Sequence, residues 1–541
     1  MWYLLSANTT FAYTHADTLR GSNGRGREWW DVKYYNLGVE FDTAAKSISG
    51  QNTISLQVIK KPIDSMQIDL QEPMELDSVL LTVYTDDTII HIPINFKRQG
   101  NVWWLTYKFS EWEKGSTKDL QMYYHGKPRT AVNPPWDGGF SWTKDTAGNP
   151  WIAVTCQELG ASVWWPCKDA QWDEPDNGMS IALTVPKGLK AISNGKLLLV
   201  SNVDDDHTTY SWGVKNPINN YDVTFYIGDY VHGQDTLMGE KGELDLSFWV
   251  LRYNEEVAKK QFEVVKPMIH CFEYWMGPYP FYEDGYKLVD APYLGMEHQS
   301  AIAYGNKCKK GYLGFDRTFT GIGMDFDYII VHESGHEWFG NNVTAKDVAD
   351  MWVQEGITTF AEALFVECLD GKEKAQKYCR GEWRNIQNDK PIIGNYGVNN
   401  EGSEDMYDKG AAIMYMVRMM TNDDEKFRAM LRGLGKDSYH QTVTTQQIEG
   451  DIAWHTGLKL TAFFNQYLRT TKIPQLEYTI KNDELSYKFN NIVPEFTLPI
   501  TVTAEDSTTA TIKPTEDWQH IKWVAKGEVK FSKDFLFKVK K

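Results

Sequence analysis

The sequence is poor in cysteine and has no long hydrophobic run. Its six cysteines in 541 residues include no C-x-x-C pair, which argues against a thiolate zinc site and against thioredoxin-like redox chemistry. Six are too few for a disulfide framework in so long a chain, although a bridge between Cys156 and Cys167 stays open. No run of about 18 apolar residues occurs, so we expect no transmembrane helix.

Basic residues are also scarce. Lys and Arg number 56 against 73 Asp and Glu, which gives a formal net charge of −17. A field of this sign repels nucleic-acid phosphates and anionic lipids, so we expect neither a nucleic acid nor a membrane as a partner. The charge identifies no substrate, and the composition leaves the oligomeric state open.

The N-terminus lacks the features of a complete export signal. Its apolar stretch, Trp2 to Ala7, is short and follows no basic residue, so we interpret it as a frayed end. A remnant of a truncated export signal is the alternative. The compartment therefore stays open between export and the cytoplasm.

Aromatic residues are abundant, at 14% of the chain, which is typical of strand-rich domains. A chain of this length predicts roughly three to four domains. The patterns predict a multidomain α+β protein with an all-β domain over residues 1–231, a mainly helical domain over residues 232–470 and a small β-sandwich over residues 471–541.

Two changes of hydrophobic period support this division. In the first region Ile48, Ile54, Leu56 and Val58 recur at even spacing, which places them on one face of a strand. From about residue 253 the spacing becomes three to four, which predicts a helix whose face contains Val257, Gln261, Val264, Met268 and Phe272. Further helical patterns follow, one of them with Thr444 or Thr445 as its N-cap, and strand patterns return after Pro474.

One segment of the helical region carries the pattern of a metal site. His332 and His336 stand four residues apart, so their imidazoles face the same way on a helix and can bind one zinc ion. Glu333 follows the first histidine and can reach a water on the open side of the metal without being a ligand. This H-E-x-x-H pattern predicts that Glu333 is a catalytic base.

A third ligand is predicted in the next helical segment. Glu355 lies nineteen positions after His336, a gap that allows a loop and a second helix to return to the same ion. Two imidazoles, one carboxylate and one water form a four-coordinate catalytic zinc site with an open position. We therefore expect one zinc ion held by His332, His336 and Glu355.

At these residues the chain resembles the gluzincin aminopeptidases, the family of aminopeptidase N and leukotriene hydrolase. Residues 293–299 resemble the family's G-x-M-E-N exopeptidase motif, with Leu294 and His298 in place of its first Gly and its Asn. Residues 406–410 resemble its Y-x-K-G element, and residues 336–341 its H-Q-W-F-G-N element. Gln157, upstream of residues 165–167, resembles the substrate-binding Gln or Glu before its P-C motif. The similarity runs from about Trp30 to about Pro474.

The resemblance implies a thermolysin-like catalytic domain and roles for further residues. Tyr407 would donate its hydroxyl hydrogen bond to the developing oxyanion, and Glu297 with Gln157 would bind the free α-ammonium of a peptide substrate. The substrate-binding set also includes Gly295, Met296 and His298, although His298 is equally well explained as a buried structural imidazole. Glu337 adjoins a zinc ligand but faces another side of the helix.

The sequence therefore predicts a zinc aminopeptidase that hydrolyses the N-terminal peptide bond of peptides. Three alternatives stay open: a zinc endopeptidase with the same core, a catalytically silent peptide-binding module, and a bifunctional hydrolase that also acts on a lipid epoxide. Many members of the family carry a long C-terminal helical domain, whereas about seventy β-like residues follow the helical region here. We expect wider access to the site, or a partner that covers it.

Overall fold

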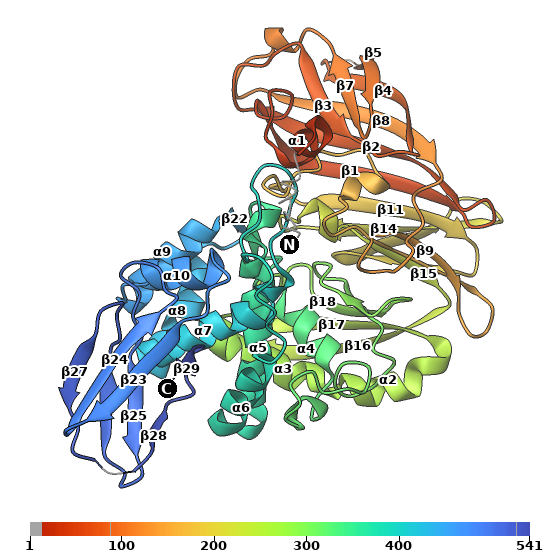
Figure 1. The fold of residues 1–541 in the computed structure, drawn as a ribbon. Helices are drawn as coiled ribbons and strands as arrows, with labels where there is room; N and C mark the ends of the chain where they lie inside the picture. Colours follow the sequence, from red (N-terminus) through yellow and green to blue (C-terminus); the bar gives the residue numbers. More distant parts are fainter. Residues whose placement is uncertain (1–12, 87, 526, 541) are drawn as a thin grey trace, which may run out of the picture.

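The computed structural model describes residues 13–86, 88–525 and 527–540 (Figure 1). Along these residues β structure comes first, then a mainly helical region, then β structure again, so the predicted multidomain α+β class is confirmed. Figure 1 shows the N-terminal sheets (red to yellow) above the helices (green to cyan) and the last strands (blue) on the other side of the helices. The predicted boundaries near residues 231 and 470 stay predictions.

The N-terminal region contains an eight-stranded sheet. Its order is β13 (Lys196–Asn202), β14 (His207–Val214), β11 (Met179–Pro186), β1 (Trp30–Asp42), β2 (Ser47–Val58), β8 (Thr117–Gly126), β4 (Glu75–Tyr84) and β5 (Ile89–Pro93). Ile48, Ile54, Leu56 and Val58 of β2 are all at most 3% exposed, so the even spacing predicted the buried face correctly.

Two smaller sheets complete this region. One has the order β12 (Lys190–Ser193), β15 (Phe225–Gly228), β10 (Pro150–Thr155) and β9 (Gly139–Lys144), and the other has the order β3 (Ser65–Asp69), β7 (Val102–Thr106) and β6 (Asn95–Gln99). A short helix, α1 (His15–Gly21), precedes all of these strands. β10 ends two residues before Gln157, so this residue lies just beyond the end of the strand.

The middle region begins with a five-stranded sheet. Its order is β16 (Tyr230–Gly239), β17 (Gly242–Leu251), β18 (Tyr286–Asp290), β20 (Ile302–Tyr304) and β19 (Gly295–Met296). β19 forms one edge of this sheet and pairs antiparallel with β20. Gly295 and Met296, both predicted to contact the substrate, are therefore edge-strand residues.

Helices follow this sheet. They are α4 (Tyr328–Gly335), α5 (Trp352–Asp370), α6 (Lys372–Glu382), α7 (Asp408–Thr421), α8 (Asp424–Asp437), α9 (Thr445–Thr456) and α10 (Thr461–Leu468), with a two-stranded sheet of β21 (Val343–Ala345) and β22 (Gln441–Val443) between them. Thr444 caps α9 by accepting a hydrogen bond from the Gln447 N–H, which confirms one of the two predicted N-caps.

The helix predicted over residues 257–272 is interrupted. α2 (Glu255–Gln261) passes into a 3-10 turn over Phe262–Val264, and α3 (Val265–Met276) follows that turn. The buried face runs through this turn at three-to-four spacing, over Ala258, Phe262 and Val265. Val257 is 50% exposed, so the predicted face is wrong by one position in α2.

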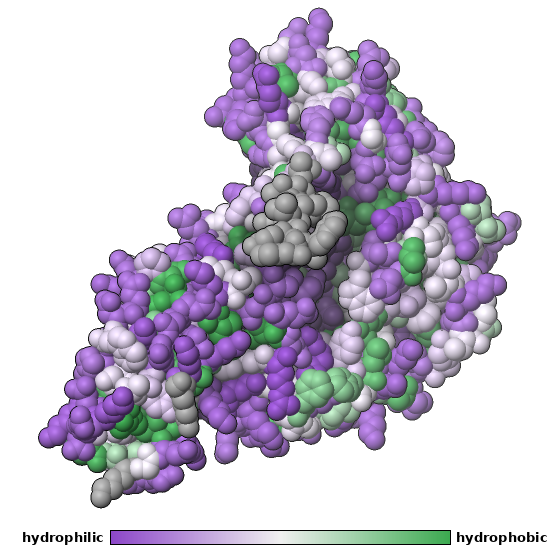
Figure 2. All heavy atoms as spheres, in the orientation of Figure 1, coloured by the Kyte–Doolittle hydropathy of each residue, from purple (hydrophilic) through white to green (hydrophobic). Residues whose placement is uncertain are grey.

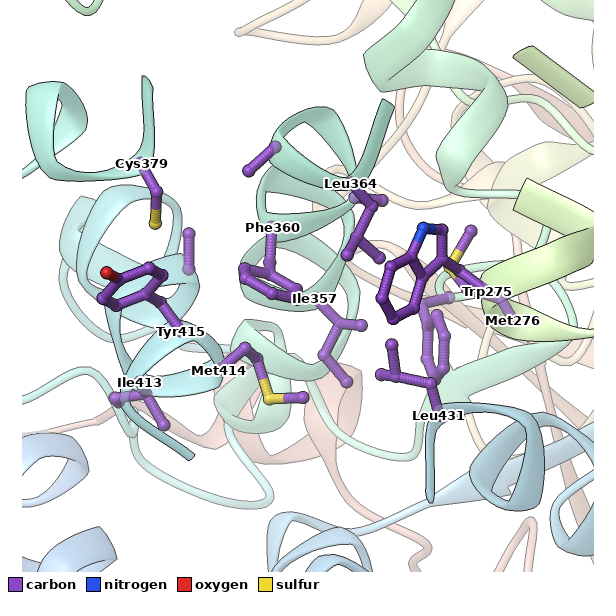
Figure 3. Close-up of a cluster of buried hydrophobic side chains, with 14 of the residues drawn as sticks. Trp275, Met276, Ile357, Phe360, Leu364, Cys379, Ile413, Met414, Tyr415 and Leu431 are labelled. Atoms are coloured by element: carbon purple, nitrogen blue, oxygen red, sulfur yellow. The ribbon is translucent and has the colours of Figure 1, made fainter. Parts of the chain in front are cut away.

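α5 is buried without interruption from Trp352 to Val366. Figure 3 shows Ile357, Phe360 and Leu364 of α5 packed between Trp275 of α3 and Met414 of α7. A disulfide between Cys271 and Cys368 also joins α3 to α5. Cys156 and Cys167 are both free and buried, so the bridge that the sequence left open between them does not form.

The last region consists of two sheets. One has the order β27 (Gln519–Lys522), β24 (Glu484–Asn490), β23 (Gln475–Lys481) and β29 (Lys538–Lys540), and the other the order β26 (Thr509–Ile512), β25 (Ile500–Ala504) and β28 (Val529–Phe531). Tyr478 of β23 and Phe531 of β28 meet with ring centroids 5.0 Å apart, so the sheets share a core as the predicted sandwich requires. None of the described helices is both long enough and apolar enough to cross a membrane.

Candidate metal centre and substrate cavity

α4 is held in place at its first turn by a buried carboxylate. Asp327 is the N-cap of this helix and accepts hydrogen bonds from the backbone N–H groups of Ile329 and Ile330. The same carboxylate also accepts from Asn306 Nδ2 and from the Tyr304 hydroxyl, each at 2.7 Å. Because Tyr304 lies in β20, this cap fixes α4 relative to the sheet.

The three predicted metal ligands converge on one point. The Nε2 atoms of His332 and His336 lie 3.3 Å apart, and Glu355 Oε2 lies 3.7 Å from the first and 3.3 Å from the second. All three side chains are buried, with residues at most 5% exposed. The spacing in the sequence therefore predicted a real cluster, and within the described residues it is the group of three that could hold a metal ion.

The outer nitrogens of both imidazoles are fixed by acceptors. His332 Nδ1 lies 2.7 Å from Glu362 Oε1, and His336 Nδ1 lies 3.0 Å from the carbonyl oxygen of Phe339. Since a carboxylate and a carbonyl can only accept, each Nδ1 carries a proton, which leaves each Nε2 to present a lone pair to a metal ion. The sequence analysis missed Glu362, although it stands seven residues after Glu355 and hence on the same face of α5.

These distances fit a zinc ion. Ligand atoms about 2.1 Å from a tetrahedral zinc are roughly 3.4 Å from one another. Glu355 Oε2 is buried and has no hydrogen-bond partner, so it is an acceptor without a donor. Burial alone would raise the pKa of Glu355, but the two imidazoles, when they are protonated, outweigh burial and lower this pKa far below its usual range; a zinc ion bound to their neutral form would supply positive charge at the same place.

Glu333 faces the open side of this cluster. Its pKa is raised to about 7, chiefly by burial, while His332 and His336 oppose the shift. The edge strand β19 passes close to it: a Cβ atom added at Gly295 would come within 2.6 Å of Glu333 Oε1. Glycine at this position therefore leaves the room that Glu333 needs beside the metal site.

Tyr407 lies directly before α7 and beside the first zinc ligand. Its ring stacks on the His332 imidazole with centroids 6.1 Å apart and planes 28° apart. Burial raises the pKa of Tyr407 well above its usual value, so the hydroxyl stays protonated and can donate a hydrogen bond. The side chain lines the cavity in front of the metal site.

Glu297 and Gln157 meet beside the metal ligands. Gln157 Nε2 donates to Glu297 Oε1 at 2.7 Å and lies 3.4 Å from Glu355 Oε1. The Tyr221 hydroxyl also donates to Glu297 Oε1, at 3.3 Å. Tyr221 and Gln157 come from the N-terminal region, so two domains build this corner. Tyr221 had no signal in the sequence, because only the packing of the domains brings it here.

The predicted residues face a cavity of about 760 Å³ between the two domains. In the space-filling view the surface is hollowed between the upper and lower parts of the molecule (Figure 2). Gly295 and Met296 line the cavity, as predicted. Its described lining is strongly acidic. Apart from the histidines, the one basic residue in this described lining is Arg317. Its acidic residues are Glu158, Glu297, Glu333, Glu355, Glu401, Glu404, Asp405 and Asp408.

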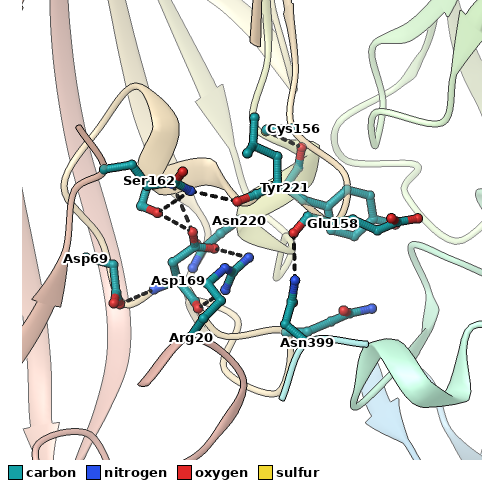
Figure 4. A network of polar contacts seen from close by, with 12 residues as sticks. Arg20, Asp69, Cys156, Glu158, Ser162, Asp169, Asn220, Tyr221 and Asn399 are labelled. Atoms are coloured by element: carbon teal, nitrogen blue, oxygen red, sulfur yellow. Dashed lines mark hydrogen bonds and ion pairs between the residues drawn. The ribbon is translucent and has the colours of Figure 1, made fainter. Parts of the chain in front are cut away.

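One contact within the N-terminal region and one between the domains hold the wall that carries Gln157. Arg20 of α1 donates to the carbonyl oxygen of Asp169 at 2.7 Å, and Asn399 Nδ2 donates to the carbonyl oxygen of Glu158 at 2.9 Å. Figure 4 shows both contacts. Gly21, the last residue of α1, lies so close to the 398–399 backbone that an added Cβ would come within 2.3 Å of Asn399 N.

Two residues near the motifs do not face the cavity. His298 is fully buried, its Nδ1 lies 2.8 Å from the Tyr226 hydroxyl, and burial lowers its pKa to about 3. The structure thus corrects the prediction that His298 contacts the substrate and favours the alternative of a structural imidazole. Glu337 is also fully buried, and its Oε1 accepts from the Ser300 N–H at 2.8 Å. Glu337 therefore supports the loop behind Glu297.

The fold and the metal centre together define a zinc-dependent metallopeptidase. The family model for the peptidase M1 N-terminal domain matches residues 32–221, and the model for the peptidase family M1 domain matches residues 260–467. The chain belongs to peptidase family M1. This confirms the predicted relationship to aminopeptidase N and leukotriene hydrolase.

Individual relatives are distant. Leukotriene A-4 hydrolase of Xenopus laevis is 22% identical over 78% of this chain and 67% of its own length, and endoplasmic reticulum aminopeptidase 1 of Mus musculus is 24% identical over 54% of this chain and 32% of its own. The chain thus spans from about a third to two thirds of the curated relatives it matches. The solved M1 zinc metallopeptidase from Deinococcus radiodurans has the same fold, with a TM-score of 0.67 and 17% identity over 83% of this chain and 96% of that chain.

Proposed function

We propose that this protein is a zinc-dependent aminopeptidase that removes the N-terminal residue from peptides. The observation that carries the proposal is the placement of Glu297 and Gln157 beside the ligand set of His332, His336 and Glu355. A carboxylate at this position attracts the α-ammonium group of a substrate, and it would place the first peptide bond over the metal. The curated relatives named aminopeptidases support the same activity.

Each remaining group has a task in this reaction. Zinc bound by the three ligands would polarise the scissile carbonyl and acidify a water molecule. Glu333 accepts the proton of the attacking water and returns it to the leaving amine, a role that suits a carboxylate with a pKa of about 7. Tyr407 donates a hydrogen bond to the carbonyl oxygen as negative charge develops there.

The charge of the cavity supports an exopeptidase that acts at the amino end. Eight acidic side chains and one arginine are among its described lining residues, so the field favours a cationic terminus over a carboxylate. An endopeptidase would require a neutral chain to continue past Glu297. The complete set of ligands, base and phenol speaks against a silent binding module, and the described residues offer no feature that favours a lipid epoxide.

A panel of fluorogenic aminoacyl substrates tests the proposal. Each substrate is assayed with a free and with an N-acetylated amine, in the presence and absence of a metal chelator. We expect hydrolysis of the free amines that the chelator abolishes and added zinc restores. Equal hydrolysis of the acetylated substrates would instead indicate an endopeptidase, and no hydrolysis under any condition would contradict the proposal.

We also propose that the protein is exported to an oxidising compartment. The disulfide between Cys271 and Cys368 supports this, because such bonds persist where thiols are not kept reduced. The test is mass spectrometry of protein isolated from its native cells with free thiols blocked at lysis. Blocking of Cys271 and Cys368 would contradict the proposal.

A further inference from the structure

We infer that Arg317 is a positioning residue that fixes Tyr407 relative to the zinc ligand His332. The inference rests on the proposed function and adds to it a residue that no motif of the sequence contains. Arg317 lies in the loop before α4, and it is the one Arg or Lys among the described residues that line the cavity. Its side chain is 29% exposed, so one edge of it is open to the cavity.

Arg317 contacts both sides of the catalytic machinery at once. Nη1 donates to the hydroxyl of Tyr328, the first residue of α4, and Nη2 lies 3.4 Å from Asp408 Oδ2, on the first residue of α7. The planar guanidinium donates in two directions from separate nitrogens in a fixed fork, whereas an ammonium group has a single nitrogen with rotatable donors. Arg317 thus joins the helix that carries His332 and Glu333 to the helix that follows Tyr407.

On the α4 side, the contact reaches the first zinc ligand through one residue. Tyr328 stacks on the His332 imidazole with centroids 5.3 Å apart and planes 14° apart, and its hydroxyl lies 3.4 Å from His332 Nδ1. The Arg317 guanidinium also lies over the Tyr328 ring, 5.1 Å from its centroid. The arginine therefore fixes both the ring and the hydroxyl of Tyr328.

On the α7 side, the contact reaches Tyr407 through its neighbour. Asp408 is 7% exposed, and its carboxylate accepts from Asn385 Nδ2 at 3.1 Å in addition to the ion pair with Arg317. Tyr407 itself has no helical conformation, with φ −71° and ψ −85°, and α7 begins directly after it. A buried carboxylate that loses its cation is costly. Removal of Arg317 would therefore move Asp408 and, with it, Tyr407.

A double-mutant cycle tests this inference. If Arg317 acts through Tyr407, Arg317→Met lowers kcat at least about tenfold with KM changed less than about threefold. In a Tyr407→Phe background the same substitution then lowers kcat less than about threefold, because the hydroxyl it positions is already gone. Arg317→Lys, which keeps the charge near Asp408 but loses the fork, should lie between wild type and Arg317→Met. If Arg317→Met does not fold, Arg317→Lys takes its place in the double-mutant cycle.

Arg469→Met is the matched control. Arg469 pairs with Glu449 at 2.5 Å, the two side chains are 35% and 17% exposed, and neither lines the cavity. We expect this variant to lose stability without a change in kcat.

Amide hydrogen exchange provides a readout that needs no activity. The Ala411 N–H donates to the Tyr407 carbonyl oxygen at 2.8 Å, so its exchange rate reports the order of this segment. We expect faster exchange at Ala411 in Arg317→Met and no change in Arg469→Met. Zinc content should stay at wild-type level in both variants.

Three results would overturn the inference: an equal loss of kcat in both backgrounds, unchanged exchange at Ala411, or a loss confined to KM for substrates with a free carboxylate. The last would show that Arg317 binds substrate directly. If the wild-type protein hydrolysed no substrate, the proposed function would fail, and the exchange measurement would still decide the role of Arg317.

Discussion

Gln157 Nε2 donates a hydrogen bond to Glu297 Oε1 at 2.7 Å, across 140 positions of the sequence. The amide belongs to the N-terminal β domain and the carboxylate to the loop after β19 of the catalytic domain. Because the pair lies beside Glu355, recognition of a substrate's amine depends on the packing of the two domains as well as on the motifs. A change that separates the domains should therefore weaken substrate binding while the zinc ligands still hold the metal.

Glu297→Ala should raise KM for substrates with a free amine. A charged hydrogen bond to an ammonium contributes about 1.5–3 kcal/mol, which corresponds to roughly 10- to 100-fold in KM. Steady-state kinetics on free and N-acetylated substrates checks this, with Glu449→Ala, outside the cavity, as control. If the variant still discriminated between the two substrates as the wild type does, Glu297 would have another role.

Glu333→Gln should keep its zinc and lose nearly all turnover. The amide has nearly the same shape but cannot take a proton, and loss of a general base costs about 10²- to 10⁴-fold. Metal analysis of the purified variant should give the wild-type zinc content, which separates a chemical defect from a lost ligand. Full activity of this variant would exclude Glu333 as the base.

Tyr407→Phe should lower kcat about 10²- to 10³-fold and change KM little, because the hydroxyl is needed only when charge develops on the carbonyl oxygen. Tyr415→Phe is the matched control, since Tyr415 is a buried phenol on α7 whose hydroxyl faces Arg380 and Asp534. An unchanged kcat in Tyr407→Phe would mean that another group stabilises the oxyanion.

Glu362→Gln should weaken zinc binding without removing a ligand. Glu362 fixes the Nδ1 proton of His332, and partners of this kind change metal affinity by about 10- to 100-fold. Titration with a competing chelator, monitored by activity and by bound zinc, measures the shift. Chelation of the wild type should also lower its Tm, since zinc binds the folded state. Wild-type affinity in Glu362→Gln would contradict the proposed role.

Removal of the Cys271–Cys368 disulfide should destabilise the catalytic domain. The bond closes a loop across a sequence separation of 97, and loss of a bond of this kind costs about 2–5 kcal/mol. We expect a lower Tm for Cys271→Ser, and a similar fall for the wild type in reductant. Cys308→Ser, which removes a free cysteine, serves as the control. Equal melting temperatures for all variants would show that the pair adds no stability.

Local patterns predicted most of what lies within one helix or strand. The buried face of β2, the helices α5, α7, α8 and α9 and the metal ligands all follow from local sequence patterns, among them spacings of two, four and nineteen residues. The predictions failed where packing against other segments decided whether a side chain is buried. Val257 is exposed because α2 packs through its neighbour Ala258 instead, and His298 is buried because the loop after β19 packs it under Tyr226.

The sequence by itself indicated the pair His332 and His336, because the period of a helix fixes which side chains share one face, and it predicted Glu355 and the base Glu333 from their spacing to that pair. Only the tertiary structure decided which distant residues complete the site. Glu362 behind His332, Gln157 against Glu297, and Arg317 between Tyr328 and Asp408 are brought together by the packing of separate elements. Apart from the seven-residue spacing between Glu355 and Glu362, such contacts leave no periodic trace in a sequence, because the free energy that creates them comes from burial and hydrogen bonding between segments rather than within one.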